Sequence, residues 1–283
     1  IMRQKFLSLF ILVFVSVTMA FAGSDKIKFE EYTLDNGLHV ILHQDHSAPI
    51  VSVNVMYHVG SKNETPDRTG FAHFFEHLMF EGTKNIDRGE YSEIVEKAGG
   101  TLNANTSADR TFYYEILPSN QLELGLWLEA ERMLHAKVDS AGIATQKKVV
   151  IEEKKQRYDN RPYGDILIQT MDRAFKKHPY QWTTIGDEEH IRAAEDHEFQ
   201  EFYNMFYVPN NSVLVVAGDF EKKEAKKYID KYYATIPKSD QEIRRPDKDE
   251  PPLKGEIRDT IYDQIQLPAI IQAYRTPAMG TDD

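Results

Sequence analysis

The residues best suited to chemistry lie in the short run His73-Phe74-Phe75-Glu76-His77. On a helix, His73 and His77 lie about one turn apart on the same face, and Glu76 projects from the same arc. Zinc binds imidazole nitrogens at about 2 Å, so two histidines at this spacing can hold one ion. Glu76 is close enough to move a proton beside that ion. The simpler alternative is a partly buried pair of histidines without a metal.

The order of these residues indicates how the roles are divided. His-x-x-Glu-His is the reverse of the His-Glu-x-x-His motif of zinc peptidases. In the inverted form, the glutamate next to the second histidine is the expected general base and not a ligand. Glu76 is therefore predicted to act on water, and His73 and His77 are predicted to bind the metal.

A catalytic zinc site also needs a third protein ligand and an open position for water. The candidates lie in an expected helix around residues 149–155. Glu153 follows Val149 and Val150 by four and three residues, so it shares their face, which we expect to pack. Glu152 lies among lysines on a charged face. Helical phase therefore favours Glu153, and Glu152 stays open as the alternative.

The elements that must position these side chains follow from the apolar pattern. Asn36-Gly37 between two alternating segments predicts a β-hairpin. Further strands are expected at residues 49–59, 101–107, 111–117 and 212–217, and helices at 70–81, 88–98, 120–135, 144–158, 163–176, 195–207 and 221–235. The fold class is therefore α+β, with a mixed, largely antiparallel sheet of about six strands packed against several helices.

Composition excludes several classes of function. The chain has 283 residues, 41% hydrophobic residues, a net charge of −11 and no cysteine. Without cysteine there is no disulfide framework, no thiol nucleophile and no cysteine-bound metal, so a metal must be held by His, Asp or Glu. An acidic chain does not suit the phosphate backbone, so no nucleic-acid partner is expected.

The amino terminus has the pattern of an export signal. Arg3 and Lys5 precede an apolar run over 6–17, and Ala20-Phe21-Ala22 is typical of a cleavage site. We expect Met2 to be the start and residues 1–22 to be a cleaved signal peptide. A permanent anchor is the alternative, but the run is shorter than a span of about 20 residues. The mature chain is expected to have no stable membrane anchor and to reside in a bacterial periplasm or outside the cell.

The remainder of the chain divides into a domain, a linker and a short tail. Residues 23–236 are predicted to form the zinc-bearing domain, and the proline-rich stretch 237–252 a linker. Strands expected at 255–262 and 267–274 would begin a second domain over 253–283, too short to fold alone. The acidic run at 187–189 is expected to be a solvated surface.

Three separated blocks carry a resemblance to a known family. The stretches 60–64 and 69–83 resemble the active-site helix of the pitrilysin/insulinase family of zinc peptidases, which includes the mitochondrial processing peptidase. Residues 99–107, with Thr111 and Tyr113, are similar to the substrate-side strand of that family. Its third ligand lies about 76 residues beyond the second histidine, which here is Glu153.

The resemblance implies a mechanism and a partner. One Zn²⁺ would be bound by His73, His77 and Glu153, Glu76 would be the catalytic base, and extended peptide would pair with the strand at Asn103, Ala104 and Asn105. That segment could also be an ordinary strand with solvated polar residues.

One position departs from the family. Gln146 stands where relatives usually have a glutamate, and it can support the site by hydrogen bonding but cannot act as a base. The predicted function is a zinc endopeptidase acting on extended or unfolded peptides, completed by a second homologous half or partner subunit. A non-catalytic scaffold or partner of the same fold is the alternative, and an exported metal-binding protein without hydrolysis is a third possibility.

Overall fold

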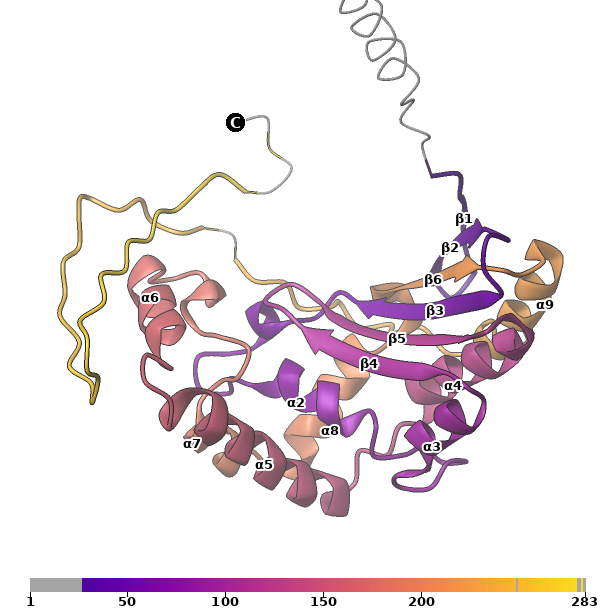
Figure 1. Cartoon of the computed structure of the whole chain (residues 1–283), viewed down its shortest axis with the longest axis horizontal. Coiled ribbons are helices and arrows are strands. Elements are labelled where there is room, and N and C mark those ends of the chain that lie inside the picture. Colours follow the sequence, from indigo (N-terminus) through magenta and orange to yellow (C-terminus); the bar gives the residue numbers. More distant parts are fainter. Residues whose placement is uncertain (1–26, 248, 279–280, 282–283) are drawn as a thin grey trace, which may run out of the picture.

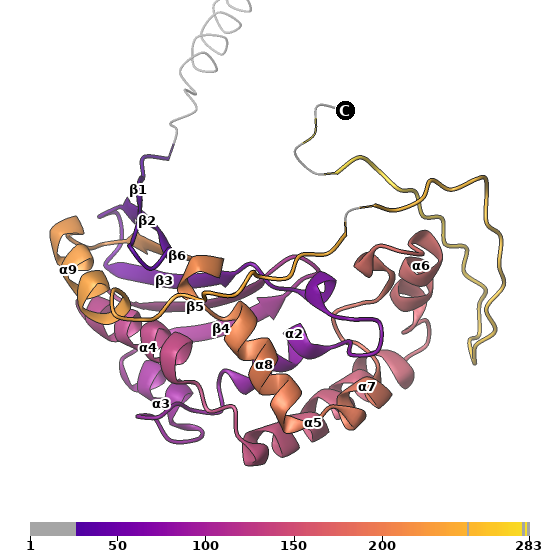
Figure 2. The same cartoon turned by 180° about the vertical axis from the view of Figure 1, so that it is seen from behind.

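The computed structural model describes residues 27–247, 249–278 and 281, and the expected signal peptide lies outside them. A six-stranded sheet forms one layer, and helices form a second layer on one of its faces (Figures 1 and 2). The strands are β1 (Glu30–Thr33), β2 (His39–Gln44), β3 (Ile50–Tyr57), β4 (Thr101–Thr106), β5 (Thr111–Pro118) and β6 (Ser212–Gly218). This arrangement confirms the α+β prediction.

The helices follow the sequence pattern closely, with one addition. They are α2 (Phe71–Leu78), α3 (Glu90–Lys97), α4 (Leu122–His135), α5 (Ser140–Lys154), α6 (Ile166–Ala174), α7 (Glu188–Ala193), α8 (Asp196–Phe206) and α9 (Lys222–Tyr233). Helix α7 lies where only a solvated acidic run was expected. Asp187 caps it by accepting a hydrogen bond from the Glu189 N–H, and Ile191 is buried. Within the described residues, no helix combines the length and apolarity needed to cross a bilayer.

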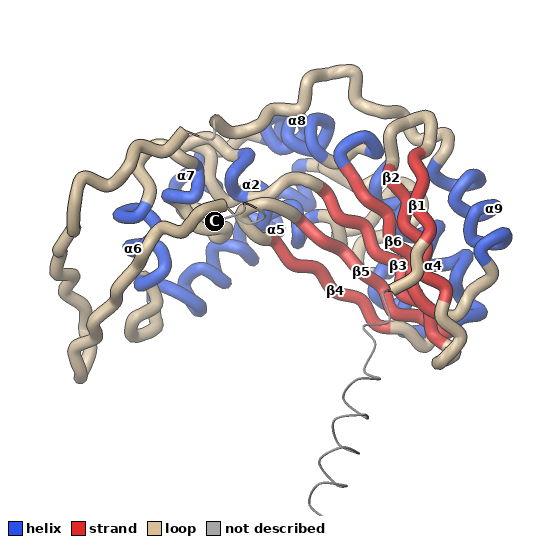
Figure 3. The backbone as a smooth tube through the Cα atoms, turned by 90° about the horizontal axis from the view of Figure 1, so that it is seen from above, coloured by secondary structure: helices blue, strands red, loops and turns tan. Residues whose placement is uncertain are grey.

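The sheet order β1-β2-β6-β3-β5-β4 places β4 at an edge (Figure 3). Only β2 and β6 pair in parallel, and every other neighbouring pair is antiparallel. The predicted hairpin joins β1 to β2, with Gly37 at φ 87°, a conformation that suits glycine. Along β3, Val51, Val53 and Val55 are fully buried against the helices, as the alternation predicted.

The core beneath the sheet is rich in aromatic residues that lock α2 against α8. The Phe71 and Phe199 rings stack with centroids 4.6 Å apart, and the Phe75 and Phe202 rings stack at 5.6 Å. Ring pairs of this kind add directional packing to the burial of apolar area. One side of α2 is thus committed to the core, and its opposite side is left for polar residues.

The expected strands at 255–262 and 267–274 are absent from the described structure. Both segments are extended but join no ladder there, and Tyr262 and Ile270 are 93% and 89% exposed. A strand needs a partner for its backbone hydrogen bonds, and alternation alone supplies none. The tail instead lies beside α6, where Asp259 accepts hydrogen bonds from Arg173 (Figure 1). The predicted second domain after residue 252 therefore stays a prediction.

A buried ion cluster ties α4 to the sheet. The Arg132 guanidinium lies 3.3 Å from Glu129 and 3.6 Å from Glu115 of β5, and all three side chains are almost fully buried. The same guanidinium lies over the Tyr91 ring at 4.3 Å. Burial raises the pKa of both carboxyl groups, and the Arg132 guanidinium opposes this shift.

We predict that Arg132→Met lowers the free energy of unfolding by roughly 3–5 kcal/mol, because two buried carboxyl groups lose their cation. Urea unfolding measures the change. The control is Arg192→Met, which removes an exposed ion pair with Glu188 and should cost less than about 1 kcal/mol. Equal losses in the two variants would contradict the role of the buried cluster.

Candidate metal centre

Helix α2 begins after Gly70, and a residue outside the helix caps its first turn. Gly70 has φ 92° and offers no side chain to the first turn. The carboxylate of Glu64 takes this place, accepting the Gly70 and Ala72 N–H groups at 2.9 Å each. Burial raises the pKa of Glu64 to about 8, although these backbone N–H groups favour the ionised form and oppose the shift.

The histidines lie on the side of α2 that faces away from the aromatic core. His73 is buried and His77 is partly exposed, with ring centroids 4.9 Å apart. On the packed side, the Tyr113 hydroxyl of β5 donates to the Phe75 carbonyl at 2.8 Å, which ties the middle of α2 to the sheet. The histidine pair is thus fixed by contacts made elsewhere on the same helix.

Helix α5 brings a carboxylate to the histidine pair. Glu153 Oε2 lies 3.1 Å from His77 Nε2, and Glu153 Oε1 lies 3.6 Å from His73 Nε2. Single donor atoms of these three residues all lie within 4.8 Å of one another, and they form the one such group in the described part of the chain. Glu152 is exposed and accepts a hydrogen bond from Gln156 instead. Of the two acids left open by sequence, the geometry favours Glu153.

The donor set suits zinc in charge and protonation. Burial and the neighbouring His77 lower the pKa of His73 to about 4, so its ring is neutral at pH 7 and keeps a lone pair for a metal. The hydrogen bond from His77 lowers the pKa of Glu153, so its carboxylate is ionised. Two histidines and one carboxylate form a recurrent ligand set of catalytic zinc.

The Arg157 guanidinium supports the Glu153 carboxylate from outside the group of three expected ligands. Helix α5 ends in a π-helical turn, η3 (Lys155–Asp159), which places Arg157 one turn beyond Glu153. Arg157 Nη1 lies 2.7 Å from Glu153 Oε1, which leaves Oε2 beside His77. Metal-binding carboxylates are commonly held by such outer partners. Arg157 was not among the site residues expected from sequence, although its i+4 spacing from Glu153 can be read there.

Glu76 lies on α2 beside the histidines and contacts the edge strand. Thr106 of β4 donates a hydrogen bond to Glu76 Oε2 at 2.6 Å. Thr106 was absent from the expected site residues, although alternation places it on the same face of β4 as Ala104. The pair links the expected base to the strand at which peptide is expected to bind.

The expected substrate residues lie along the outer edge of β4. Asn103 and Asn105 are exposed, and Ala104 is half-buried. The Ala104 N–H donates to the Asn103 side-chain oxygen at 2.8 Å, and Arg110 donates to the Asn105 side-chain oxygen at 2.6 Å. An edge strand of this kind can accept another strand. Their role in binding peptide stays a prediction.

Gln146 lies two turns before Glu153 on α5, and its amide has a definite partner. It donates to Glu81 Oε1 at 2.5 Å, while Glu81 Oε2 pairs with Arg88. Arg88 in turn approaches Asp139, the capping residue of α5. The glutamine therefore links the segment after α2 to the helix that carries Glu153.

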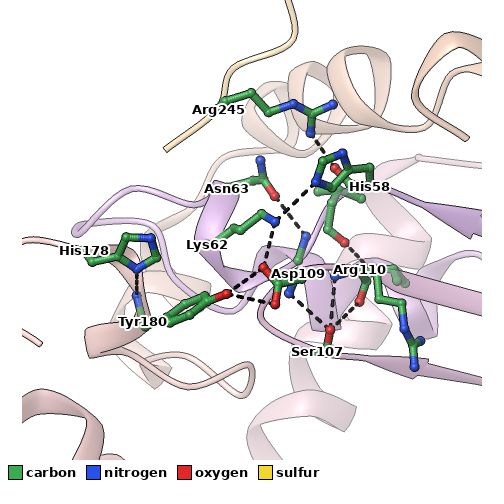
Figure 4. A network of polar contacts seen from close by, with 12 residues as sticks. His58, Lys62, Asn63, Ser107, Asp109, Arg110, His178, Tyr180 and Arg245 are labelled. Carbon is green, nitrogen blue, oxygen red and sulfur yellow. Dashed lines mark hydrogen bonds and ion pairs between the residues drawn. The ribbon is translucent and has the colours of Figure 1, made fainter. Parts of the chain in front are cut away.

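A network of polar contacts joins the turn between β4 and β5 to the segment that precedes α2. In Figure 4, Lys62 and Tyr180 converge on Asp109, in the turn between β4 and β5. The Lys62 Nζ lies 2.7 Å from Asp109 Oδ1, and the Tyr180 hydroxyl lies 2.8 Å from the same oxygen. These contacts hold the end of β4 against the segment that precedes α2.

Comparison with known families decides the classification. Residues 39–188, more than half of the chain, match the model described as Insulinase (Peptidase family M16). The chain belongs to the insulinase family. The model of the Peptidase M16 inactive domain matches residues 196–283 of the same chain.

Relatives of this insulinase-family chain agree in sequence and fold. The zinc protease PqqE of Helicobacter pylori is 32% identical over 259 residues, which are 90% of this chain and 58% of that protein. A crystal structure of a protease from Helicobacter pylori has 33% identity and a TM-score of 0.77, covering 80% of this chain and 55% of that one.

A third match concerns half of a longer protein. The first half of the periplasmic protease PqqL from Escherichia coli has 25% identity and a TM-score of 0.67, covering 77% of this chain and 49% of that one. The chain thus spans about half the length of the relatives that it matches. The family resemblance and the fold predicted from it are confirmed.

The metal centre makes a direct prediction about binding. His73→Ala, His77→Ala and Glu153→Gln should each reduce zinc affinity by more than the tenfold to hundredfold typical of losing an outer-shell partner. Zinc stoichiometry by atomic absorption and a chelator competition measure this. Glu152→Gln is the matched control and should retain one zinc per chain. Loss of zinc in Glu152→Gln, with retention in Glu153→Gln, would reverse the assignment.

The buried cap of α2 makes a prediction about pH. The pKa of Glu64 is raised from 4.5 to about 8 on folding, so the folded state binds the extra proton. The contribution of Glu64 to the free energy of unfolding therefore falls as the pH rises from about 4.5 to about 8, by at most about 1.4 kcal/mol per unit. Glu64→Gln should lack this fall, which urea unfolding at several pH values measures. Parallel pH profiles for the two proteins would refute it.

Proposed function

We propose that the chain is the metal-bearing part of a zinc-dependent endopeptidase that hydrolyses peptide bonds in extended or unfolded peptides. The carrying observation is the convergence of His73, His77 and Glu153, with Glu76 on the same helix and an exposed edge strand beside it. The zinc proteases among the relatives support the reaction class. Peptide bonds as substrate follow from the family, and the preference for extended chains follows from the edge strand.

The residues divide the chemistry between them. A zinc ion bound by His73, His77 and Glu153 would lower the pKa of water toward about 7 and polarise a peptide carbonyl. As the water attacks the carbonyl carbon, Glu76 takes a proton from it. Glu76 then passes that proton to the leaving amine. The backbone at Asn103–Asn105 holds the peptide extended along β4, which limits the substrate to segments free of other structure.

A second half or partner subunit completes the proposed enzyme. The matched part of PqqL is the first half of that protease. The apolar side chains of the tail, including Tyr262 and Ile270, are exposed in a manner that suits further chain packed against them. Export to a periplasm is supported by the amino-terminal pattern and by the periplasmic relative.

A non-catalytic partner of the same fold is the second candidate. It is favoured by Gln146, which stands in place of an acidic residue and donates to Glu81. The complete set of His73, Glu76, His77 and Glu153 favours the enzyme instead. Both candidates predict the same fold, so only activity separates them.

We predict that Glu76→Gln retains zinc but loses at least about a hundredfold in peptide cleavage, because general-base catalysis typically contributes 10²–10⁴. The measurement is kcat/KM on an unstructured fluorogenic peptide with the full-length protein, together with zinc content. His73→Ala is the companion variant and should lose both. Cleavage by Glu76→Gln at the parent rate would refute the assigned base, and a zinc-loaded parent without cleavage would favour the non-catalytic partner.

A further inference from the structure

The Glu76 side chain has a single hydrogen-bond partner among the described residues, and that partner is a neutral hydroxyl on another element. Thr106 Oγ1 lies 2.6 Å from Glu76 Oε2. We propose that Thr106 is a positioning residue that orients the carboxylate of Glu76 for proton transfer. This inference rests on the proposed peptidase function and assigns a role to a residue outside the metal ligands and the base.

The direction of the hydrogen bond supports a positioning role. An ionised carboxylate only accepts, so the threonine hydroxyl must be the donor. With Oε2 bonded to Thr106, Oε1 has no hydrogen-bond partner among the described residues and can receive a proton from water. Hydrogen bonds to a charged acceptor are shorter and stronger than neutral ones, which matches the 2.6 Å separation.

The donor stands on a rigid part of the sheet. Thr106 pairs with Thr111 in the β4–β5 ladder, and the Thr111 hydroxyl donates to the Val59 carbonyl at 2.9 Å. Threonine is branched at Cβ and has few side-chain rotamers on a strand. The hydroxyl is therefore held in place by the strand rather than by a flexible chain.

The acceptor is on an equally constrained helix. The Phe75 carbonyl, one residue before Glu76, receives the Tyr113 hydroxyl of β5. Glutamate still has three rotatable side-chain bonds beyond this anchored backbone, and these are the freedom that Thr106 removes. Catalysis requires groups that are held close to the reactive geometry, and supporting contacts of this kind hold them there.

The same hydroxyl connects substrate binding to the base. Thr106 immediately follows the strand residues at which peptide is proposed to pair, so β4 carries both the peptide edge and the support for Glu76. A change in the position of β4 would move the carboxylate with it. We therefore expect loss of the hydroxyl to reduce turnover rather than peptide binding or zinc binding.

The experiment compares three variants of the full-length protein. Thr106→Val removes the hydroxyl at nearly constant volume, Thr106→Ser restores it, and Thr33→Val makes the same change at an exposed position of β1, the opposite edge strand of the sheet. We expect kcat of Thr106→Val to fall about tenfold to a hundredfold, with KM within about twofold of the parent. Thr106→Ser should recover most of the rate, and Thr33→Val should match the parent.

Two further readouts do not depend on turnover. Zinc stoichiometry and affinity should be unchanged in Thr106→Val, because the ligands keep their geometry. A crystal structure of metal-free Thr106→Val should show the Glu76 carboxylate in more than one rotamer, whereas Thr106→Ser should show one. A single unchanged rotamer in Thr106→Val, or an unchanged kcat, would overturn the proposal.

The inference and the proposed function fail in different ways. If Glu76→Gln cleaves peptide at the parent rate, the proposed base itself is wrong. If Glu76→Gln is inactive while Thr106→Val is as active as the parent, only the positioning role is wrong. In the Glu76→Gln background, adding Thr106→Val should not reduce any residual rate further, because the two residues act as one unit.

Discussion

The whole site depends on one requirement placed on α2. This eight-residue helix must present His73 and His77 to a carboxylate on α5 while its opposite side remains packed in the core. A helix of that length has little stability of its own, so tertiary contacts must hold it. Glu64 satisfies the N–H groups of its first turn, Tyr113 binds the carbonyl of Phe75 in its middle, and the aromatic rings of α8 cover its apolar side. The position of each histidine therefore follows from residues that would never touch a metal.

The sheet edge decides what can approach this helix. In Figures 1 and 2, α2 lies between the sheet and α5, beneath the edge strand β4. An interior strand would be occupied on both sides by its neighbours, whereas β4 has a neighbouring strand on one side only among the described residues. The Asp109 network and the Glu76–Thr106 contact hold this edge in a fixed relation to α2. The contact between α2 and β4 thus sets the relative positions of the metal ligands, the base and the strand edge at which peptide is proposed to bind.

Local patterns predicted a large part of this arrangement. Alternation along β3 and the Asn36-Gly37 turn indicated the sheet, because burial on one face and hairpin geometry are encoded within a few residues. Helical phase favoured Glu153 over Glu152 because two valines earlier on the helix were expected to pack on its face. Only part of that premise holds, since Val150 is buried and Val149 is 42% exposed. Contacts between distant segments were not predictable in this way: Glu64 reaches α2, Thr106 reaches Glu76, and Arg132 is buried against β5. The strands expected in the tail are absent from the described residues for a related reason. A strand needs a pairing partner, and periodicity in the sequence does not identify one.

We expect His73, His77 and Glu153 to form one zinc site on the side of α2 that faces α5. The most direct measurement is anomalous diffraction at the zinc edge from crystals of the zinc-loaded full-length protein. We predict a single strong peak about 2.0–2.2 Å from one nitrogen of each histidine and one oxygen of Glu153. A peak coordinated by Glu152, or zinc bound away from both histidines, would contradict it.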